Sequence, residues 1–281
     1  MRVTSTDGVR LAVYSDGDPG ATTIVAVHGY PDNHSVWDGL AALLAERYRV
    51  VRYDVRGAGA SDAPGARGAY RMGQLVDDLG AVLDAVSPSA PVHLLGHDWG
   101  SVQCWPALAE ARVAGRIASF TSVSGPSLDH TGAWLRDWRR HAGAALRQLA
   151  SSYYVALFQL PVLPELLWRS GAIDAVLAQG ATVHRAEHDK INGLELYRAN
   201  IFRGLRRPAS HRIAVPVQVI APRGDVFVSP ALQTQAPVDY VDDLRVRIVD
   251  SGHWVICEQP DTVAGAITDF VNDVEERSLP A

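Results

Sequence analysis

The chain contains little lysine and little cysteine. Its charge balance and its cysteine spacing limit the partners and the kinds of site that it can have. Lys190 is the only lysine among 26 basic residues, and 31 acidic residues give a formal net charge of −5. A negative net charge argues against nucleic acid or an anionic membrane as a partner. Cys104 and Cys257 fit no metal-binding spacing and allow at most one disulfide, so we expect free thiols in a reducing cytoplasm.

Long apolar runs are also missing. A membrane-spanning helix needs about 20 consecutive apolar residues, and the most apolar segment, residues 153–178, is interrupted by Pro161, Pro164, Glu165 and Arg169. The N-terminus carries no apolar signal core. We therefore expect a cytoplasmic protein without a membrane span. With 281 residues, 47% of them hydrophobic, the chain is long enough to bury a sizeable core.

What is present is a regular alternation of strand-like and helix-like segments. Short β-branched or apolar runs predict strands, and apolar residues at helical spacing predict helices between them. The expected strands are residues 2–6, 9–14, 22–27, 48–55, 92–95, 117–123, 217–220 and 244–249, and the expected helices are residues 37–45, 72–86, 101–111 and 262–274. This order is typical of an α/β fold with a mostly parallel sheet and helices on both faces. Ligands of such sheets bind at the carboxyl ends of the strands, where His28, Arg56 and Asp98 are expected.

The alternation stops between residues 129 and 210. This region contains no convincing strand and is rich in aromatic residues and helix formers. A helical block placed between two strands of an open sheet is best interpreted as a cap over the binding site. The expected organisation is an α/β core built from residues 1–128 and 211–281, with a helical cap insertion at residues 129–210.

The centre of the pattern is the motif Gly96-His97-Asp98-Trp99-Gly100, between an expected strand and an expected helix. A sharp strand–turn–helix flanked by glycines is a nucleophile elbow, which lifts its central side chain above the edge of the sheet. That position usually holds serine, but here it holds Asp98. A carboxylate is already ionised at neutral pH and attacks without first losing a proton. The alternative is a strand-end turn in which Asp98 only caps the helix.

Three further motifs lie near the ends of expected strands. They are His28-Gly29-Tyr30-Pro31, Arg56-Gly57-Ala58-Gly59-Ala60-Ser61 and Gly252-His253-Trp254. With the elbow, and in this order and spacing, they make the chain resemble the epoxide hydrolase branch of the α/β-hydrolase superfamily over essentially its whole length. Residues 121–126 also resemble actinobacterial members, some of which carry a short-chain dehydrogenase after the hydrolase.

The resemblance implies a catalytic triad. Asp98 attacks a strained ring carbon and forms an alkyl–enzyme ester, and His253 activates the water that hydrolyses this ester. An acid must orient the imidazole of His253. Asp225 matches the family position, and Asp129, which follows the preceding strand, is the alternative.

The resemblance also implies an oxyanion hole. The backbone N–H groups of Tyr30 and Trp99 stabilise the oxyanion that forms when the ester is hydrolysed. His28, Gly29 and Pro31 belong to the loop that holds Tyr30 in place. A purely structural role for His28, as a hydrogen-bond partner within this loop, is compatible with that assignment.

Two cap tyrosines are implied as donors to the epoxide oxygen. Ring opening leaves an alkoxide, and a phenol stays protonated at neutral pH and donates to it. One family tyrosine precedes a Phe-Gln-x-Pro pattern, found here at residues 158–161, which points to Tyr154. The other begins a Tyr-Arg-x-Asn pattern at Tyr197. The sequence leaves open whether Tyr153 or Tyr154 faces the substrate, and aromatic residues at helical spacing often serve only as core.

No metal or cofactor is expected. His184 and His188, four residues apart, have a spacing that allows metal binding. Their neighbours Arg185 and Glu187 indicate a solvated helix face instead.

The sequence therefore predicts a cofactor-independent epoxide hydrolase that converts an apolar epoxide and water into a vicinal diol. A haloalkane or haloacid dehalogenase, which shares the aspartate nucleophile, is the first alternative. A small-molecule receptor without turnover is the second. The identity of the epoxide and the oligomeric state stay open, a homodimer being one option.

Overall fold

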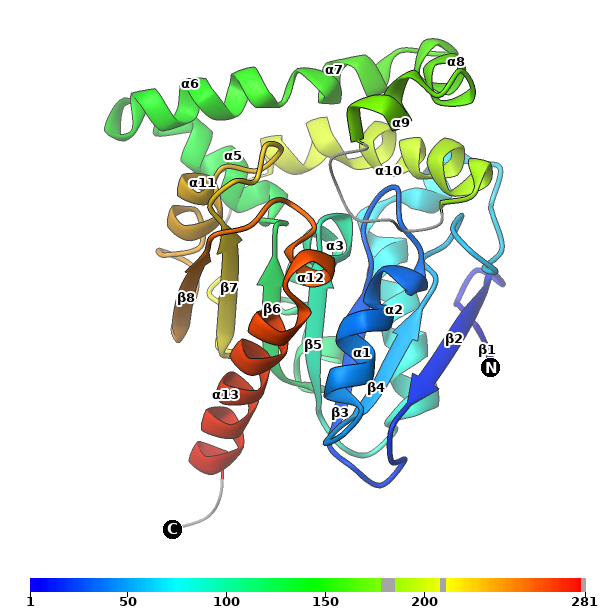
Figure 1. The fold of residues 1–281 in the computed structure, drawn as a ribbon, viewed down its shortest axis with the longest axis vertical. Helices are drawn as coiled ribbons and strands as arrows, with labels where there is room; N and C mark the ends of the chain where they lie inside the picture. Colours follow the sequence, from blue (N-terminus) through cyan, green and yellow to red (C-terminus); the bar gives the residue numbers. More distant parts are fainter. Residues whose placement is uncertain (178–184, 208–210, 279–281) are drawn as a thin grey trace.

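A single eight-stranded sheet forms the centre of the computed structural model, which describes residues 1–177, 185–207 and 211–278 (Figure 1). Its strands are β1 (Arg2–Thr4), β2 (Arg10–Asp16), β3 (Thr23–Val27), β4 (Arg49–Tyr53), β5 (Val92–His97), β6 (Ile117–Val123), β7 (Val217–Pro222) and β8 (Leu244–Val249). Their order is β1-β2-β4-β3-β5-β6-β7-β8. Only the pairings β1–β2 and β2–β4 are antiparallel within this sheet as described. The expected mostly parallel α/β sheet is confirmed.

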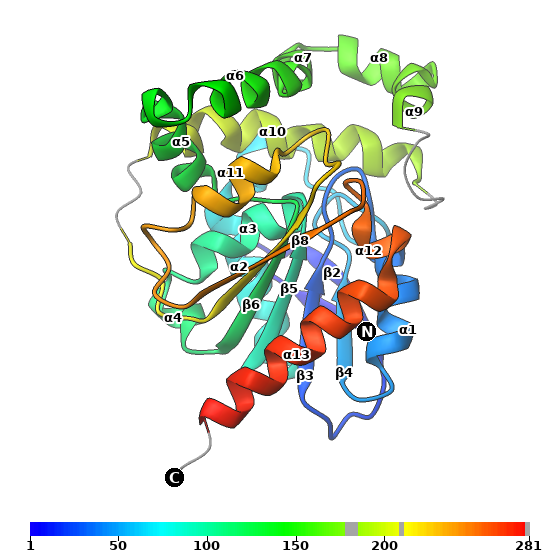
Figure 2. The ribbon, with the colours of Figure 1, turned by 60° about the vertical axis from the view of Figure 1, so that its left-hand side comes forward.

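Helices cover both faces of the sheet (Figures 1 and 2). These helices are α1 (Asp38–Leu44), α2 (Met72–Val86), α3 (Trp99–Ala107), α4 (Ala111–Ala114), α11 (Pro230–Gln235), α12 (Val255–Glu258) and α13 (Pro260–Ser278). Leu75, Leu79 and Leu83 recur at helical spacing on α2 and pack with α3 against one face. On the other face α1 and α13 pack together, with Leu40 and Ile267 buried between them and the sheet.

Between β6 and β7 the described residues form helices joined by short connections, and none of them belongs to a strand of the sheet. The helices are α5 (Leu128–Arg136), α6 (Ala142–Ser151), α7 (Tyr153–Gln159), α8 (Leu163–Arg169), α9 (Ala172–Leu177) and α10 (Glu187–Arg206). We call these six the cap helices, because they lie above the carboxyl ends of the parallel strands (Figure 2). Short 3₁₀ segments occur at η1 (His34–Trp37), η2 (Arg67–Tyr70) and η3 (Trp138–Arg140). Among the helices described, none combines the length and the apolar character needed to cross a bilayer.

Buried polar contacts attach α10 to the core. The carboxylate of Asp189 accepts hydrogen bonds from the side-chain amide of Asn33 at 3.0 Å and from the N–H of Gly59 at 2.7 Å. Towards the other end of α10, the side-chain amide of Asn200 donates to the carbonyl of Tyr70 at 2.8 Å. Because these groups are buried and paired, the position of α10 over the sheet is closely determined.

Two local expectations were wrong. The helix expected over residues 101–111 ends at Ala107, because Pro106 has no N–H to continue the helical bonding, and α4 follows as a separate turn. Arg56 follows β4 as expected but does not face the binding edge. Its guanidinium is buried, with Asp78 at 2.6 Å and Asp7 at 2.9 Å, so its role is structural.

Candidate active site

Asp98 stands on the turn between β5 and α3. Its backbone φ of 51° lies in the left-handed region, which is unusual for a residue with a side chain and is the expected conformation of a nucleophile elbow. The opposing loop approaches so closely that a Cβ atom on Gly29 would collide with the Asp98 carboxylate and with the carbonyl of His97. Glycine is therefore required at position 29.

The loop after β3 places a backbone donor on the Asp98 carboxylate. The N–H of Tyr30 donates to Oδ1 of Asp98 at 2.7 Å, and the peptide bond between Tyr30 and Pro31 is cis. Trp99 is the first residue of α3, so its N–H belongs to the orphan donors of a helix start. The Tyr30 N–H thus reaches the Asp98 carboxylate, which is the position expected from the sequence for one donor of an oxyanion hole.

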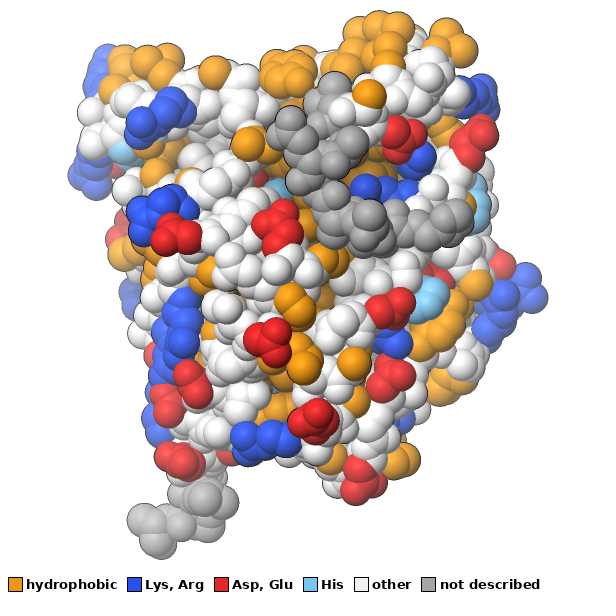
Figure 3. All heavy atoms as spheres, viewed as in Figure 1, with side chains coloured by type: hydrophobic (Ala, Val, Ile, Leu, Met, Phe, Trp, Pro, Cys, Tyr) orange, Lys and Arg blue, Asp and Glu red, His pale blue; other side chains and the backbone are white. Residues whose placement is uncertain are grey.

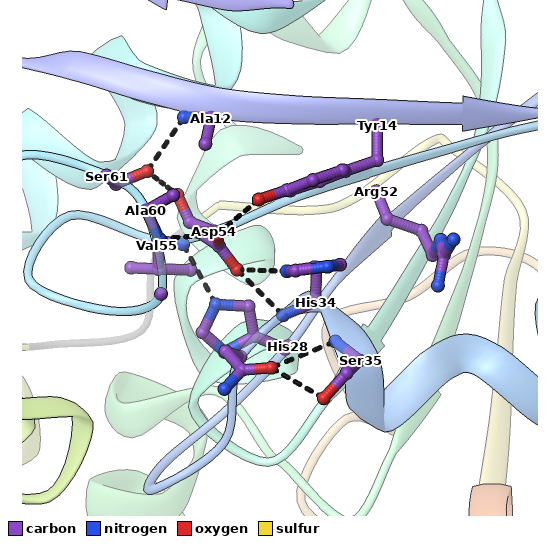
Figure 4. Close-up of polar contacts among 12 residues, drawn as sticks. Ala12, Tyr14, His28, His34, Ser35, Arg52, Asp54, Val55, Ala60 and Ser61 are labelled. Atoms are coloured by element: carbon purple, nitrogen blue, oxygen red, sulfur yellow. Dashed lines mark hydrogen bonds and ion pairs between the residues drawn. The ribbon is translucent and has the colours of Figure 1, made fainter. Parts of the chain in front are cut away.

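His28 connects this loop to the loop that follows β4. Its Nδ1 lies 2.9 Å from the carbonyl of Gly29, and its Nε2 accepts the N–H of Val55 at 2.9 Å (Figure 4). Both ring nitrogens are used, which matches one neutral tautomer. This is the structural role that the sequence leaves open for His28.

Asp54 forms a second polar centre beside the same loop. Its buried carboxylate accepts hydrogen bonds from the N–H groups of His34 and Ala60, both at 2.8 Å, and from the hydroxyl of Tyr14 at 3.2 Å (Figure 4). The Nδ1 of His34 lies 2.7 Å away, and its ring stacks on Tyr14. Burial would raise the pKa of Asp54, but His34 and the other donors lower it to about 2.

The imidazole of His253 lies between two carboxylates. Its Nδ1 lies 3.0 Å from Oδ2 of Asp225, and its Nε2 lies 3.6 Å from Oδ2 of Asp98. Burial would lower the pKa of His253, but the two carboxylates outweigh it and raise the pKa to about 10. The structure therefore brings together the three groups that the sequence predicts as a triad.

Asp225 is held by more than His253. It follows β7, and its Oδ1 accepts the N–H groups of Phe227 and Val228, both at 2.9 Å, while Oδ2 accepts the side-chain amide of Gln233 at 3.1 Å. Burial would raise the pKa of Asp225, but His253 and these donors hold it below its ordinary value.

The alternative acid, Asp129, lies at the start of α5. Its carboxylate accepts hydrogen bonds from the hydroxyl of Ser127 and from the N–H of His130. The structure thus pairs His253 with Asp225, the first choice from the sequence.

Two phenols face the same space as Asp98. Tyr154 on α7 and Tyr197 on α10 have ring centroids 6.0 Å apart in an edge-to-face arrangement, and Tyr197 also packs edge-to-face on Trp99. Burial raises the pKa of both phenols, so both stay protonated. Tyr153 is 68% exposed, and Tyr30 already uses its hydroxyl with Trp168 and the carbonyl of Lys190. Of Tyr153 and Tyr154, Tyr154 is therefore the better match to the phenol that is expected to face the substrate.

Two apolar cavities meet at Asp98. One, of about 240 Å³, lies towards His253 and α9, and the other, of about 270 Å³, lies towards α5 and Phe202. Asp98, Tyr154, Tyr197 and Phe227 line both of them. A ligand beside Asp98 would therefore have apolar space on two sides.

The sequence analysis missed two residues that hold the site together. Nε2 of His97 lies 2.9 Å from the carbonyl of His253, so a neutral His97 that donates this proton fixes the loop that carries His253. Asp32, which follows Pro31, accepts the indole N–H of Trp254 at 2.9 Å. The sequence signal that could have identified Asp32 is its position directly after the motif His28-Gly29-Tyr30-Pro31.

Asp32 also corrects the expectation of a solvated face at Arg185. The side chain of Arg185 is nearly buried, with Nε 2.7 Å from Asp32 and its guanidinium 4.9 Å above the ring of Trp254. The charge is buried because its partner carboxylate is buried too.

The histidine pair considered for a metal is only partly visible. His184 lies outside the residues that the structure describes, and His188 has its Nε2 3.0 Å from the carbonyl of Gly59. Within the ranges described, no three His, Cys, Asp or Glu side chains group in a way that could hold a metal ion.

Comparison with known proteins gives the same fold. A family model described as alpha/beta hydrolase fold matches residues 22–166. The chain is 40% identical to "Probable oxidoreductase EphD" of Mycobacterium tuberculosis, over 96% of this chain and 49% of that protein. It is 26% identical to "Epoxide hydrolase 4" of Mus musculus, over 96% of this chain and 78% of that one. The chain thus spans about half the length of the first of these relatives.

Solved structures agree at the level of the fold. A mutant of an epoxide hydrolase from Bacillus megaterium superposes with a TM-score of 0.80 at 22% identity, covering 97% of this chain and all of that one. A second neighbour, from work on novel epoxide hydrolases in metagenomes of hot environments, has a TM-score of 0.78 at 24% identity, over 96% and 97% of the two chains.

Proposed function

Because the chain belongs to the α/β-hydrolase family, we propose that it is an epoxide hydrolase that uses Asp98 as its nucleophile. The observation that carries this proposal is the position of the Asp98 carboxylate. One of its oxygens accepts the N–H of Tyr30 at 2.7 Å, and the other lies 3.6 Å from Nε2 of His253. The names of several relatives, such as "Epoxide hydrolase 4" and "Epoxide hydrolase A", support the same reaction.

In the first step the carboxylate of Asp98 attacks one carbon of the epoxide. A carbon–oxygen bond of the ring breaks, an ester forms, and the released oxygen takes a proton from Tyr154 or Tyr197. Both phenols line the cavities beside Asp98, and burial keeps both protonated until that moment.

In the second step water hydrolyses the ester. His253, oriented by Asp225, takes a proton from a water molecule, and the oxygen of that water attacks the carboxyl carbon of Asp98. The N–H groups of Tyr30 and Trp99 hold the resulting oxyanion. The bond to the alkyl oxygen then breaks, and the proton from His253 completes the second hydroxyl of the diol. The remaining proton of the water, now on the carboxyl group of Asp98, returns to the tyrosinate left by the first step, which regenerates both the carboxylate and the phenol.

We infer an apolar epoxide as the substrate, because the cavities on both sides of Asp98 are lined mainly by aromatic and aliphatic side chains. We also infer that residues 1–128 and 211–281 act as the hydrolase core and residues 129–210 as its cap. The helical content between β6 and β7 supports this division.

A single turnover in heavy-oxygen water tests the proposal. A covalent ester on Asp98, followed by heavy oxygen in the carboxylate of Asp98 on peptide mapping, is the expected result. Full diol formation by Asp98→Asn, with deamidation excluded by mass, would disprove it. Halide release from haloalkanes that survives Tyr154→Phe and Tyr197→Phe would instead assign the dehalogenase reaction, since a halide needs no phenol.

A further inference from the structure

The cap helix α6, on the outer side of the cap, buries a polar side chain and exposes leucines. On α6, Gln148 is buried and bonds the core through the carbonyl of Phe227 and the N–H of Ser229, whereas Leu146 and Leu149 face outwards, 64% and 58% exposed. A helix of a water-soluble protein normally does the opposite and buries its leucines. The exposed leucines therefore call for a partner.

The exposed apolar side chains continue over the next two helices. Figure 3 shows them along the upper edge of the molecule, over α6, α7 and α8. We call this surface the outer apolar face and define it by six exposed residues: Leu146, Leu149, Tyr153, Leu160, Leu163 and Leu166. Prolines and charges interrupt this segment in sequence, so it does not cross a bilayer, but an interfacial position asks only that one face be apolar.

The charge of this part of the cap is opposite to that of the whole chain. Residues 138–169, which reach from η3 to the end of α8, contain four arginines, Arg139, Arg140, Arg147 and Arg169, and one acid, Glu165, although the whole chain has a net charge of −5. All four arginines are exposed, and two of them pair with acids outside this segment, Arg140 with Asp137 and Arg169 with Glu187. A net charge averages over the molecule and conceals this local excess, so the argument from net charge against an anionic membrane does not apply to this face.

The face is continuous with both cavities at the nucleophile. Tyr153 lines the cavity that leads towards His253, and Leu149 lines the cavity that leads towards α5. An apolar molecule dissolved in a lipid layer would thus meet apolar surface from the layer to Asp98.

We propose that the outer apolar face docks on the surface of an anionic lipid bilayer. The leucines enter the boundary between headgroups and acyl chains, and the arginines lie at the anionic headgroups. A second copy of the chain fits less well, because a symmetric contact through this face would bring the same arginines together. The proposal goes beyond epoxide hydrolysis and is independent of it.

Sedimentation of the full chain with vesicles tests the proposal without any substrate. We expect binding to vesicles of phosphatidylcholine mixed with phosphatidylglycerol, weaker binding to phosphatidylcholine alone, and partial release by salt. Arg139→Gln with Arg147→Gln should weaken binding to the anionic vesicles by about fivefold for each arginine. The proposal would be overturned if the chain bound neither kind of vesicle. It would also be overturned if binding were equal for anionic and neutral vesicles and unchanged by the arginine substitutions.

A second variant separates the apolar contribution. Leu146→Gln with Leu166→Gln should lower vesicle binding by at least about tenfold, while its melting temperature stays that of the wild type because both side chains are exposed. Val238→Gln, at a valine that is 56% exposed outside the cap, is the matched control and should bind as the wild type does. The competing outcome is a dimer that forms in the absence of vesicles. If the double variant Leu146→Gln with Leu166→Gln dissociates such a dimer, the face binds a second copy of the chain and the lipid proposal is overturned.

Discussion

The backbone N–H of Tyr30 donates a 2.7 Å hydrogen bond to Oδ1 of Asp98 in the free protein. The donor that would hold an oxyanion is therefore already aligned on the carboxyl group where that oxyanion forms. A preorganised donor of this kind costs no rearrangement during the reaction.

Gly29→Ala should lower diol formation by at least about a hundredfold, because the new Cβ would push the Tyr30 loop away from Asp98. The rate of diol formation at saturating epoxide measures the effect. Gly39→Ala is the control: nothing lies near that position on α1, and alanine there should raise stability by up to about 1 kcal/mol. Equal activity of the two variants would show that the loop tolerates displacement.

His253→Gln should stop the reaction after the first step. The carboxylate of Asp98 still attacks the epoxide, but no base activates water, so diol formation falls by about 10²- to 10⁴-fold. Intact-protein mass spectrometry should then detect an ester that accumulates with time. A fast diol rate, or a slow rate without any adduct, contradicts the assignment of His253 as the base of the second step.

Asp98→Asn should lower the pKa of His253. Two carboxylates together raise that pKa to about 10, and the substitution removes one of them while Asp225 remains. Esterification of Asp98 removes the same charge, so the imidazole becomes a neutral base more readily once the ester has formed. Imidazole NMR signals followed through a pH titration measure the change. An unchanged pKa would mean that Asp98 has little influence on His253.

Tyr154→Phe and Tyr197→Phe should each slow formation of the ester by about a hundredfold or more, since each removes one donor to the leaving oxygen. Rapid mixing with a chromogenic epoxide measures this step directly. Tyr153→Phe is the matched control, because Tyr153 is largely exposed, and it should react as the wild type does. If Tyr153→Phe were the slow variant, Tyr153 and not Tyr154 would be the donor to the leaving oxygen.

Asp54→Asn should destabilise the fold in a pH-dependent way. The pKa of Asp54 falls from 3.8 when unperturbed to about 2 in the fold, so its ionised form stabilises the protein above about pH 4. This advantage of the wild type over the variant should disappear as the pH falls through about 2. Denaturant unfolding across this range measures it, with the exposed Asp239→Asn as a control. A constant difference would contradict the pKa shift.

The strands and the triad could be predicted because each has a local signature. A β-branched run ends in a motif, and the motif places Asp98 or His253 at the carboxyl edge of a parallel sheet. Which way a helix side chain points is not local, since it depends on what packs against the helix. Tyr153 is exposed and Tyr154 partly buried because of the contact of α7 with α10, which no pattern near residue 153 encodes.

Long-range ion pairs were equally hidden. Arg56 follows a strand end, as a site residue would, but Asp78 on α2 lies beside its guanidinium. Arg185 has the sequence neighbours of a solvated face, but Asp32, far away in sequence, lies beside it. Burial of a charge depends on a partner from elsewhere in the chain, and a single sequence does not show such pairs.

The two phenols are attached to the molecule in different ways. Tyr197 lies on α10, which is hydrogen-bonded to the core through Asp189 and Asn200. Tyr154 lies on α7, in the layer of α6, α7 and α8 that carries the outer apolar face. A displacement of that layer would therefore act most directly on the distance from Asp98 to the Tyr154 hydroxyl, with Arg198 of α10 holding the end of α7 through the carbonyls of Phe158 and Leu160. In the proposed mechanism, the rate of ring opening would then depend, through Tyr154, on what contacts the cap.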